Sequence, residues 1–265
     1  MNLKLQWRYF VLALGFFTRL PVPPLPDFDE AELNHAARYF PLVGVLVGLL
    51  AAITWWLASW IFPASIAVLC SMAASIYLTG AFHEDGLADS ADGLGGGLDR
   101  KRKLDIMQDS RLGSYGAVAL VGVLLFKFHT LSALPAAVLP FGLIAGHALS
   151  RLAAVYIMAT MPYARTSGKA KPLATTLTRQ DIWYASAFGL WSWLGFAALL
   201  WLNHGGMGAL RFLLITALPV IMVWEWWRRV LGRNLQGYTG DTLGATQQLT
   251  ELAFYLGLLA WSQLA

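Results

Sequence analysis

The sequence has little charge and almost no cysteine. Charged residues make up only 13% of its 265 residues, whereas about a quarter of an ordinary soluble domain is charged. The single cysteine, Cys70, lies in an apolar run and excludes a disulfide framework, so we interpret it as a small buried hydrophobe. The chain also lacks a basic surface motif with interleaved aromatic residues, and its net charge of +4 therefore does not indicate a nucleic-acid partner.

Three familiar catalytic or metal-binding motifs are absent. Leu87 stands where a zinc peptidase that began at His83-Glu84 would need its second histidine. Gly168-Lys169 lacks the leading glycine and the following Ser or Thr of a P-loop, and the order of the acidic residues does not fit an EF-hand. These absences argue against a zinc peptidase, a P-loop enzyme and an EF-hand protein.

Apolar residues, in contrast, make up 57% of the chain. A membrane-spanning helix needs about 20 mostly apolar residues. Seven stretches come close to this length: 40–62, 64–82, 114–133, 136–158, 183–202, 209–227 and 249–264. The last is short and carries Glu251 near its start, and Gly44 with Gly48 predicts one close helix contact. We predict an all-α, polytopic integral membrane helical bundle of about seven transmembrane helices, with residues 1–265 forming a single integral membrane catalytic domain in the lipid bilayer.

The N-terminal apolar run, residues 7–17, is too short to span a bilayer. No small-residue cleavage site follows it, so we predict an interfacial or re-entrant helix rather than a signal peptide. Four prolines in the six residues 21–26 then prevent a helix, and this segment is expected to run extended along the membrane surface.

Basic residues gather in alternate loops. They are Arg100, Lys101, Arg102, Lys103 and Arg111 after the second predicted span, Arg165, Lys169, Lys171 and Arg179 after the fourth, and Arg228, Arg229 and Arg233 after the sixth. The positive-inside rule places these loops and the N-terminus in the cytoplasm, with the C-terminus outside if the seventh helix spans. Lys127 and His129, inside the third span, are interpreted as snorkelling or packing residues.

Five aspartates form two groups with helical spacing. Asp85, Asp89 and Asp92 are related by i, i+4 and i+7, and they share one face if the helix of the second span continues past residue 82. Asp105 and Asp109 repeat the i, i+4 spacing before the third span. Carboxylates on one stripe repel each other unless a cation holds them together, and oxygen ligands suit Mg²⁺. The spacing therefore predicts a Mg²⁺ site at the cytoplasmic edge of the membrane.

Glycines accompany the acidic residues. Gly86, Gly93 and residues 95–97 remove side chains where a phosphate group would approach the backbone. The alternative interpretation is a solvated acidic loop at the membrane surface that is balanced by the basic run 100–103. Both interpretations place the segment outside the hydrocarbon core.

A carboxylate-held metal with nearby arginines suits transfer of a phosphoryl-type group, because positioning and charge neutralisation supply most of that catalysis. Residues 89–93 and 105–109 partly resemble the signature of the CDP-alcohol phosphotransferases, but Gly95 and Gly96 stand where that family has Ala-Arg. An ion-coupled transporter is a further alternative, since buried acids also line ion paths.

Six segments together carry a closer resemblance. They are FFTRLPVP at 16–23, YFPLVG at 39–44, HEDGLADSADG at 83–93, IMQDSRLGSYG at 106–116, GHALSR at 146–151 and GYTGDTLGA at 237–245. In this order they resemble the cobalamin synthase family, the membrane adenosylcobinamide-GDP ribazoletransferases. The resemblance covers nearly the full length of the chain.

The resemblance implies a reaction, a cofactor and a set of ligands. Adenosylcobinamide-GDP would transfer its phosphocobinamide moiety to α-ribazole or α-ribazole 5′-phosphate and release GMP, with Mg²⁺ as cofactor, in the bacterial cytoplasmic (inner) membrane. The expected metal ligands are Asp85, Asp89, Asp92 and Asp109, with Asp105 as a fifth candidate. By analogy with the phosphotransferases, Asp109 is also the expected general base. A homo-oligomer is one of the states that the sequence allows.

Five further residues are candidates for substrate binding, each with a structural alternative. Arg19 would reach a phosphate or anchor at lipid headgroups, and Arg111 would bind the pyrophosphate or only orient the loop. His147 and Arg151 are i, i+4 in the fourth span, so they would face substrate, make an interhelical hydrogen bond or snorkel. Asp241 would bind a ribazole hydroxyl or cap the last helix.

Overall fold

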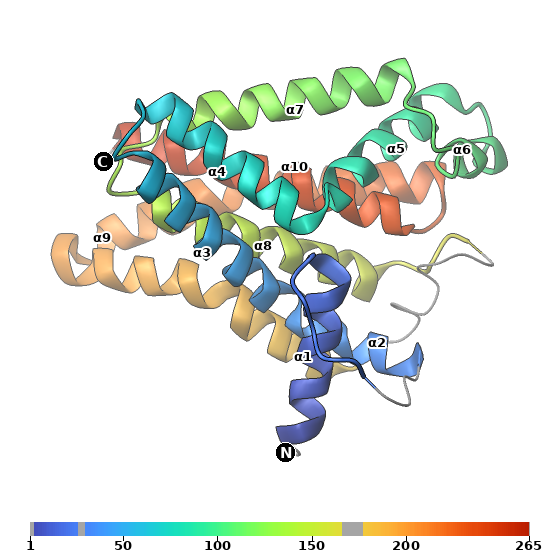
Figure 1. The fold of residues 1–265 in the computed structure, drawn as a ribbon, viewed down its shortest axis with the longest axis horizontal. Coiled ribbons are helices and arrows are strands. Elements are labelled where there is room, and N and C mark those ends of the chain that lie inside the picture. Colours follow the sequence, from blue (N-terminus) through green and yellow to red (C-terminus); the bar gives the residue numbers. More distant parts are fainter. Residues whose placement is uncertain (1–2, 26–29, 166–176, 265) are drawn as a thin grey trace.

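The computed structural model describes residues 3–25, 30–165 and 177–264, and its helices confirm the predicted all-α class (Figure 1). The helices are α1 (Leu3–Phe17), α2 (Glu30–Ala36), the 3₁₀ helix η1 (Ala37–Tyr39), α3 (Phe40–Ala58), α4 (Ala64–Thr79), α5 (Phe82–Gly96), α6 (Arg100–Ile106), α7 (Ser114–Ala133), α8 (Leu139–Thr160), α9 (Arg179–Asn234) and α10 (Gly240–Leu264). The basic residues Lys169 and Lys171 and the end of the proline-rich segment lie outside the described residues.

Five of the described helices are long and apolar enough to cross a membrane, and a sixth is obtained if α4 and α5 count as one bent span. Two of the five are the arms of α9, because the chain reverses at Gly205, whose φ of 74° lies in the left-handed region. The predicted last span, 249–264, is helical within α10, but α10 is not among the helices that meet this criterion. The polytopic bundle is thus confirmed, whereas the count of seven spans is not.

The second predicted span, 64–82, is interrupted. Gly80 and Ala81 both have left-handed φ angles, 66° and 58°. The amide of Ala81 donates to the carbonyl of Ile76, and that of Gly80 donates to the carbonyl of Tyr77, which is the Schellman way of ending a helix. The helix of α4 therefore does not continue, and α5 starts afresh at an angle of 85° to it. The four acidic residues of α5 would be costly in hydrocarbon, so α5 lies outside the spanning segments.

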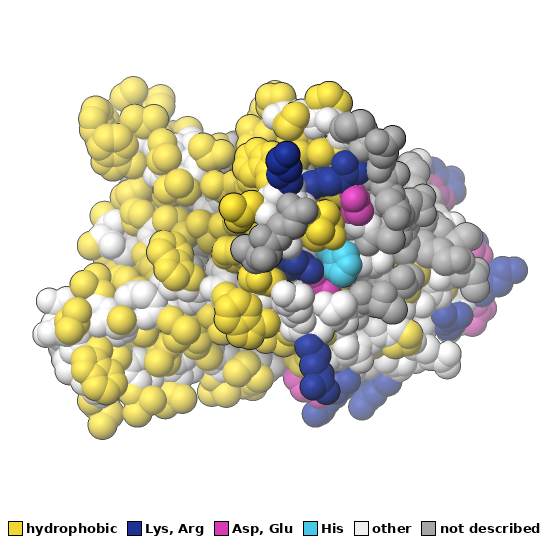
Figure 2. Space-filling model, turned by 90° about the horizontal axis from the view of Figure 1, so that it is seen from below, with side chains coloured by type: hydrophobic (Ala, Val, Ile, Leu, Met, Phe, Trp, Pro, Cys, Tyr) yellow, Lys and Arg dark blue, Asp and Glu magenta, His cyan; other side chains and the backbone are white. Residues whose placement is uncertain are grey.

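The long helices run along the same axis, whereas α1 runs across it (Figure 1). An orientation across the bundle is what an interfacial helix requires. The C-terminus lies at one end of the bundle, and α5, α6 and the first turn of α10 lie at the other (Figure 1). Hydrophobic side chains cover the C-terminal end, and charged side chains gather toward the α5/α6 end (Figure 2).

Close packing between α3 and α8 confirms the helix contact that Gly44 and Gly48 predicted. A Cβ atom on Gly48 would lie 2.6 Å from the Cα of Ile144, and one on Gly44 would collide with the carbonyl of His147. Small residues at both positions let the two backbones approach, which is how helices gain contact in a bilayer. This contact fixes α8 beside the start of α3.

A buried ion pair attaches the N-terminal helices to α9. Arg38, from η1, donates to the carboxylate of Asp181, and both side chains are buried. Asp181 also forms a capping box with Thr178 at the start of α9. Arg38 Nη1 donates to Gln6 Oε1 over 3.1 Å, which includes α1 in the same network. The first turn of α1 is thereby held against the bundle.

Candidate functional site

The acidic face lies where α5 crosses α10. Gly86, between Asp85 and Asp89 on α5, has no room for a side chain, because a Cβ atom there would lie 2.7 Å from the carbonyl oxygen of Asp241. The backbones of the two helices therefore touch at this point. Asp85 is exposed and Asp89 is half-buried, and the helical register predicted for them is confirmed by the continuous helix.

Asp89 lies in a negative environment. Burial is the first cause that raises its pKa to about 7, and the charges of Asp85, Asp241 and Asp92 raise it further, while Arg165 opposes them. Asp105 and Asp109 are not among these strongest influences. The structure thus brings Asp241, rather than the second acidic pair, to the aspartates of α5. A cation at this face would relieve the repulsion.

Asp241 is bound by an arginine from a neighbouring loop. Its Oδ2 accepts hydrogen bonds from Arg165 Nη2 over 2.8 Å and from Thr239 Oγ1 over 3.2 Å. The prediction that Asp241 caps α10 is wrong. Thr239 precedes the helix, and it exchanges hydrogen bonds with Thr242 in the manner of a cap. The carboxylate of Asp241 is thus held at the first turn of α10 without capping it.

Asp92 holds the start of α7. Its two carboxylate oxygens accept hydrogen bonds from the amides of Gly113 and Gly116, each over 2.8 Å. The side chain is buried, and a Cβ atom on either glycine would collide with it. A carboxylate at a helix N-terminus satisfies orphan amides and complements the helix dipole. These contacts are those of a helix anchor, and the metal-ligand role of Asp92 stays a prediction.

Within the described residues, the second acidic pair, Asp105 and Asp109, does not share contacts with the aspartates of α5. Asp109 forms a bidentate pair with Arg111, with Nε to Oδ1 at 2.9 Å and Nη2 to Oδ2 at 2.5 Å. Hydrogen bonds from Arg111 lower the pKa of Asp109 to about 2. Asp105 is exposed on α6. A carboxylate with so low a pKa is a weak proton acceptor, which disfavours Asp109 as the general base.

Basic residues of α6 bind the rim of the site, a role that the sequence did not suggest. Arg100 donates to the carbonyl oxygens of Leu235 and Ala164 over 2.7 and 2.6 Å, and Lys103 Nζ donates to Asn234 Oδ1 over 2.8 Å. These bonds hold together the loops that follow α8 and α9. The sequence pattern predicts only membrane orientation or charge balance for this basic run, because its partners are far away in the sequence.

His147 and Arg151 face the interior of the bundle, as their spacing on one helix face predicted. Both are buried, and Arg151 Nη1 donates to the carbonyl of His147 over 3.0 Å. His147 Nδ1 lies 3.2 Å from Glu251 Oε2, and Lys127 Nζ lies 3.0 Å from Glu251 Oε1. The snorkelling interpretation of Lys127 is wrong, because its ammonium group is buried against a carboxylate.

Two glutamines extend this interior network to α5. Gln248 Nε2 donates to Glu84 Oε1 over 2.9 Å, and Gln248 Oε1 accepts from Lys127 over 2.9 Å. Gln247 Nε2 donates to Ser150 Oγ over 3.1 Å and to Glu251. The network joins α5, α7, α8 and α10 beneath the acidic face. The polar residues of this network on α10 interrupt the apolar pattern of the last helix. This interruption is the sequence feature that could have indicated the network.

Arg19 lies at the bend between α4 and α5. Its guanidinium carbon is 5.4 Å from the centre of the Tyr77 ring, and its amide donates to the carbonyl of Leu78 over 2.8 Å. A Cβ atom on Gly80 would come within 2.8 Å of Arg19 Nε. These contacts describe an arginine that packs on the bend, and its predicted phosphate contact stays a prediction.

The donors of the acidic face fit a hard divalent cation. Within the described residues, no three His, Cys, Asp or Glu side chains are grouped closely enough to hold a metal on their own. Mg²⁺, however, is usually held by one or two carboxylates together with waters and substrate phosphates. Asp85 and Asp89 supply such carboxylates, and, after burial, the charges of Asp85, Asp241 and Asp92 raise the pKa of Asp89.

Comparison with known proteins adds a family to this geometry. Residues 9–259 match the family model described as cobalamin-5-phosphate synthase. The chain is 47% identical over 266 residues to an adenosylcobinamide-GDP ribazoletransferase of Shewanella amazonensis, with 98% of each chain covered. It is 47% identical over 259 residues to the protein of that name from Leptothrix cholodnii, covering 96% of this chain and 95% of the relative.

No solved structure matches the chain. The family match and the relatives cover nearly all of its length, which agrees with the six segments that carry the resemblance in the sequence. The chain belongs to the cobalamin-5-phosphate synthase family.

Proposed function

We propose that this protein transfers the phosphocobinamide moiety of adenosylcobinamide-GDP to α-ribazole or α-ribazole 5′-phosphate in a Mg²⁺-dependent reaction. A ribose hydroxyl attacks the phosphorus next to cobinamide, the bond between this phosphorus and the bridging oxygen breaks, and GMP leaves. The hydroxyl proton is taken up by a base, and a phosphodiester is formed. The names of the relatives supply the substrates of this proposal.

One observation carries the proposal, namely the juxtaposition of Asp85 and Asp89 on α5 with Asp241 on α10. Transfer of a diphosphate-linked group needs negative charge to be neutralised at the reacting phosphorus. Carboxylates alone would repel the substrate, so a cation between carboxylates and phosphate is required. Arg165, bonded to Asp241 at 2.8 Å, supplies a further positive group at the same place.

We assign the residues as follows. Asp85 and Asp89 would hold the Mg²⁺, which, when bound, neutralises phosphate charge and orients the diphosphate. Asp241 and Arg165 position the acceptor and the phosphates, and Arg111 lies exposed on the loop before α7, where the pyrophosphate would approach. Asp92 keeps α7 docked against α5.

We further propose that the protein resides in the bacterial inner membrane with the acidic face toward the cytoplasm. The basic helix α6 lies at the α5/α6 end (Figure 1), and its Arg100 binds the carbonyls of residues 164 and 235, which follow α8 and α9. The positive-inside rule assigns such an end to the cytoplasm. Labelling of a cysteine introduced at Leu98, which is 97% exposed, in sealed vesicles of known orientation tests this assignment.

The proposed reaction is tested with the purified full chain in detergent. Adenosylcobinamide-GDP, α-ribazole and Mg²⁺ should yield GMP and the cobalamin product in equal amounts, and chelation of Mg²⁺ should stop the reaction. Release of CMP from a CDP-alcohol with no turnover of the corrinoid would instead establish a phospholipid-type transferase. Uptake into sealed vesicles without any chemical turnover would establish a transporter.

A further inference from the structure

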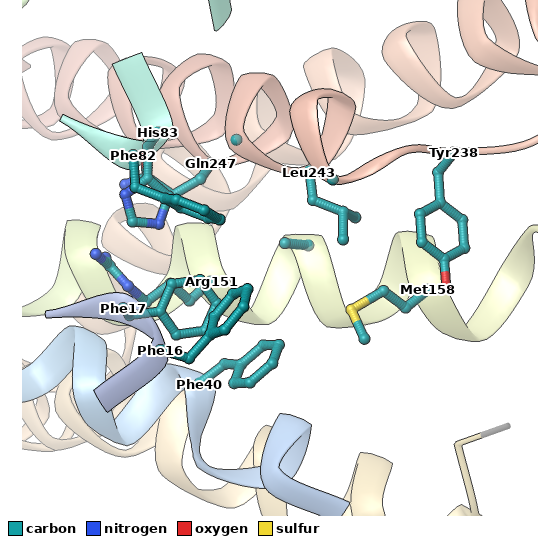
Figure 3. A pocket seen from close by; sticks show the side chains of 13 residues that line it. Phe16, Phe17, Phe40, Phe82, His83, Arg151, Met158, Tyr238, Leu243 and Gln247 are labelled. Carbon is teal, nitrogen blue, oxygen red and sulfur yellow. The ribbon is translucent and has the colours of Figure 1, made fainter. Parts of the chain in front are cut away.

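Aromatic rings from three helices enclose a cavity beside the acidic face (Figure 3). Phe16 and Phe17 end α1, Phe40 begins α3, and Phe82 and His83 begin α5. The rings of Phe17 and Phe40 are 4.5 Å apart, and those of Phe16 and Phe82 are 5.3 Å apart. His83 stacks on Phe17 at 5.6 Å with an angle of 9° between the rings. Such a lining suits a flat aromatic ligand.

One polar group of the cavity has no partner. Arg151 lines the space and is 2% exposed, and its Nε is buried without a hydrogen-bond acceptor among the described residues. Its Nη1 is engaged by the carbonyl of His147. Arg151 lies at one end of the space, and Tyr238 lies at the other (Figure 3). A buried donor without an acceptor costs free energy, and a ligand that brings an acceptor would remove this cost.

The cavity adjoins the residues proposed for catalysis. Gly240, Gly244 and Gln247 of α10 form one wall, so the cavity lies directly beside Asp241. On α5, His83 lines the cavity and Asp85 follows two positions later. A ligand whose aromatic part occupied the cavity would therefore present its remaining part to the acidic face.

Five of the six segments that carry the family resemblance converge on this place. The cavity takes residues from the segments 16–23, 39–44, 83–93, 146–151 and 237–245. These segments are far apart in the chain and belong to α1, α3, α5, α8 and the start of α10. Packing alone would not require such different segments to surround one space that contains an unpaired arginine donor.

We propose that this cavity binds the base of the acceptor substrate, a fused benzimidazole-type ring, and that Arg151 Nε donates a hydrogen bond to its unsubstituted ring nitrogen. The proposal rests on the proposed function, which supplies the acceptor, and it places the ribose toward Asp241 and Asp85. The enclosed space measures about 40 Å³, so the bicyclic ring enters as Phe82, which is 38% exposed, turns outward.

Binding of radiolabelled α-ribazole to the full chain in detergent, measured by equilibrium dialysis without the corrinoid, tests the cavity directly. Phe16→Leu removes one half-buried ring and should raise Kd by about tenfold, since aromatic pairs contribute beyond their buried area. Phe126→Leu, a change on α7 at a side chain that is 62% exposed and outside the cavity, is the matched control and should leave Kd unchanged. Equal Kd values for the two variants would overturn the proposal.

The hydrogen bond is tested with Arg151→Lys and with the indole analogue of the riboside, in which C–H replaces the ring nitrogen. The wild-type protein should bind α-ribazole about tenfold more tightly than the analogue. Arg151→Lys should bind both equally, because Nε is gone. Equal discrimination by both proteins would overturn the assignment of Arg151, and the Phe16 measurement stands if Arg151→Lys fails to fold.

The two proposals can fail separately. Wild-type protein that binds α-ribazole in the predicted manner but releases no GMP would refute the transfer reaction and retain the cavity. Normal GMP release with an unchanged KM for α-ribazole in Phe16→Leu would refute the cavity and retain the reaction. In the expected case the KM for α-ribazole rises in Phe16→Leu, while the KM for adenosylcobinamide-GDP does not.

Discussion

The carboxylates at the α5/α10 end and the carboxylate of Glu251 inside the bundle differ in the charges that surround them. Glu251 in the interior is surrounded by Lys127, His147 and Gln247. At the α5/α10 end, burial raises the pKa of Asp89 first, the carboxylates of Asp85, Asp241 and Asp92 raise it further, and Arg165 opposes them. Both regions concentrate charge between packed helices, but at the acidic face Arg165, paired with Asp241, stands against the carboxylates of Asp85, Asp89 and Asp241.

The difference separates a structural role from a functional one. A buried charge that is fully paired has no reason to bind anything further, and it holds helices in register. Partly exposed carboxylates whose repulsion is not relieved favour a ligand that brings positive charge. We therefore interpret the ion pair of Lys127 with Glu251 as a support of the bundle and the acidic face as the place of chemistry.

The largest effect, a loss of stability, is expected from breaking the buried ion pair of Lys127 with Glu251. Lys127→Met removes the ammonium group that lies 3.0 Å from Oε1 of the buried Glu251, and an uncompensated buried charge costs about 3–5 kcal/mol. Thermal unfolding in detergent, followed by circular dichroism, should show a clear drop in Tm. The double variant Lys127→Met/Glu251→Met should recover most of the loss. A single variant as stable as wild type would show that the pair does not hold the bundle.

Asp89→Asn should have the opposite effect: a loss of activity without a loss of stability. Loss of a metal-binding carboxylate should lower the rate of GMP release by more than about 100-fold, or about 2.7 kcal/mol. The free energy of unfolding should not fall, because repulsion with Asp85 and Asp241 is removed. Glu225→Gln, which removes a carboxylate from a surface pair on α9, is the control. Near-normal turnover of Asp89→Asn across a Mg²⁺ titration would refute the assignment.

Asp92→Asn distinguishes between two roles of this side chain, holding the start of α7 and binding the metal. The amide keeps one oxygen for Gly113 or Gly116 and loses the charge that favours both bonds, at a cost of about 1–3 kcal/mol in stability. Tm should therefore fall, unlike in Asp89→Asn. Unchanged Tm together with a Mg²⁺ requirement shifted to higher concentration would instead show that Asp92 acts mainly on the metal.

The smallest effect on stability and on the rate of GMP release is expected for Asp109→Asn. Its carboxylate is held at a pKa of about 2 by Arg111, and the pair is exposed, so both stability and rate should change little. The rate of GMP release should stay within about tenfold of wild type, whereas loss of a general base costs about 10²–10⁴-fold. A loss in the latter range would restore Asp109 to the role that the family analogy suggested.

Much of the fold could be predicted from local patterns. Long apolar runs predict most of the bundle, because a backbone in lipid must satisfy its own hydrogen bonds. The spacing of Gly44 and Gly48 predicted a close helix contact, and the spacing of His147 and Arg151 predicted that both lie on one face of their helix. These features depend on residues within a few helical turns of each other.

The rest depended on partners that are distant in the sequence. Nothing near Lys127 indicates that Glu251 will neutralise it, and nothing near Asp92 indicates that it will hold the amides of Gly113 and Gly116. Thr239, rather than Asp241, caps α10 because Thr242 returns its hydrogen bond. Alternatives of this kind have similar local energies, so the sequence pattern cannot choose between them.

Hydropathy and helical periodicity are local properties, and they suffice to predict a helical membrane protein with Asp85 and Asp89 on one helix. Which carboxylates meet, in contrast, depends on how the helices pack. The bend at Gly80 and Ala81 turns α5 onto α10, and the contact at Gly86 brings Asp241 beside the aspartates of α5. The charge of the candidate site is a sum over groups from different helices, and such a sum exists only after the helices have packed.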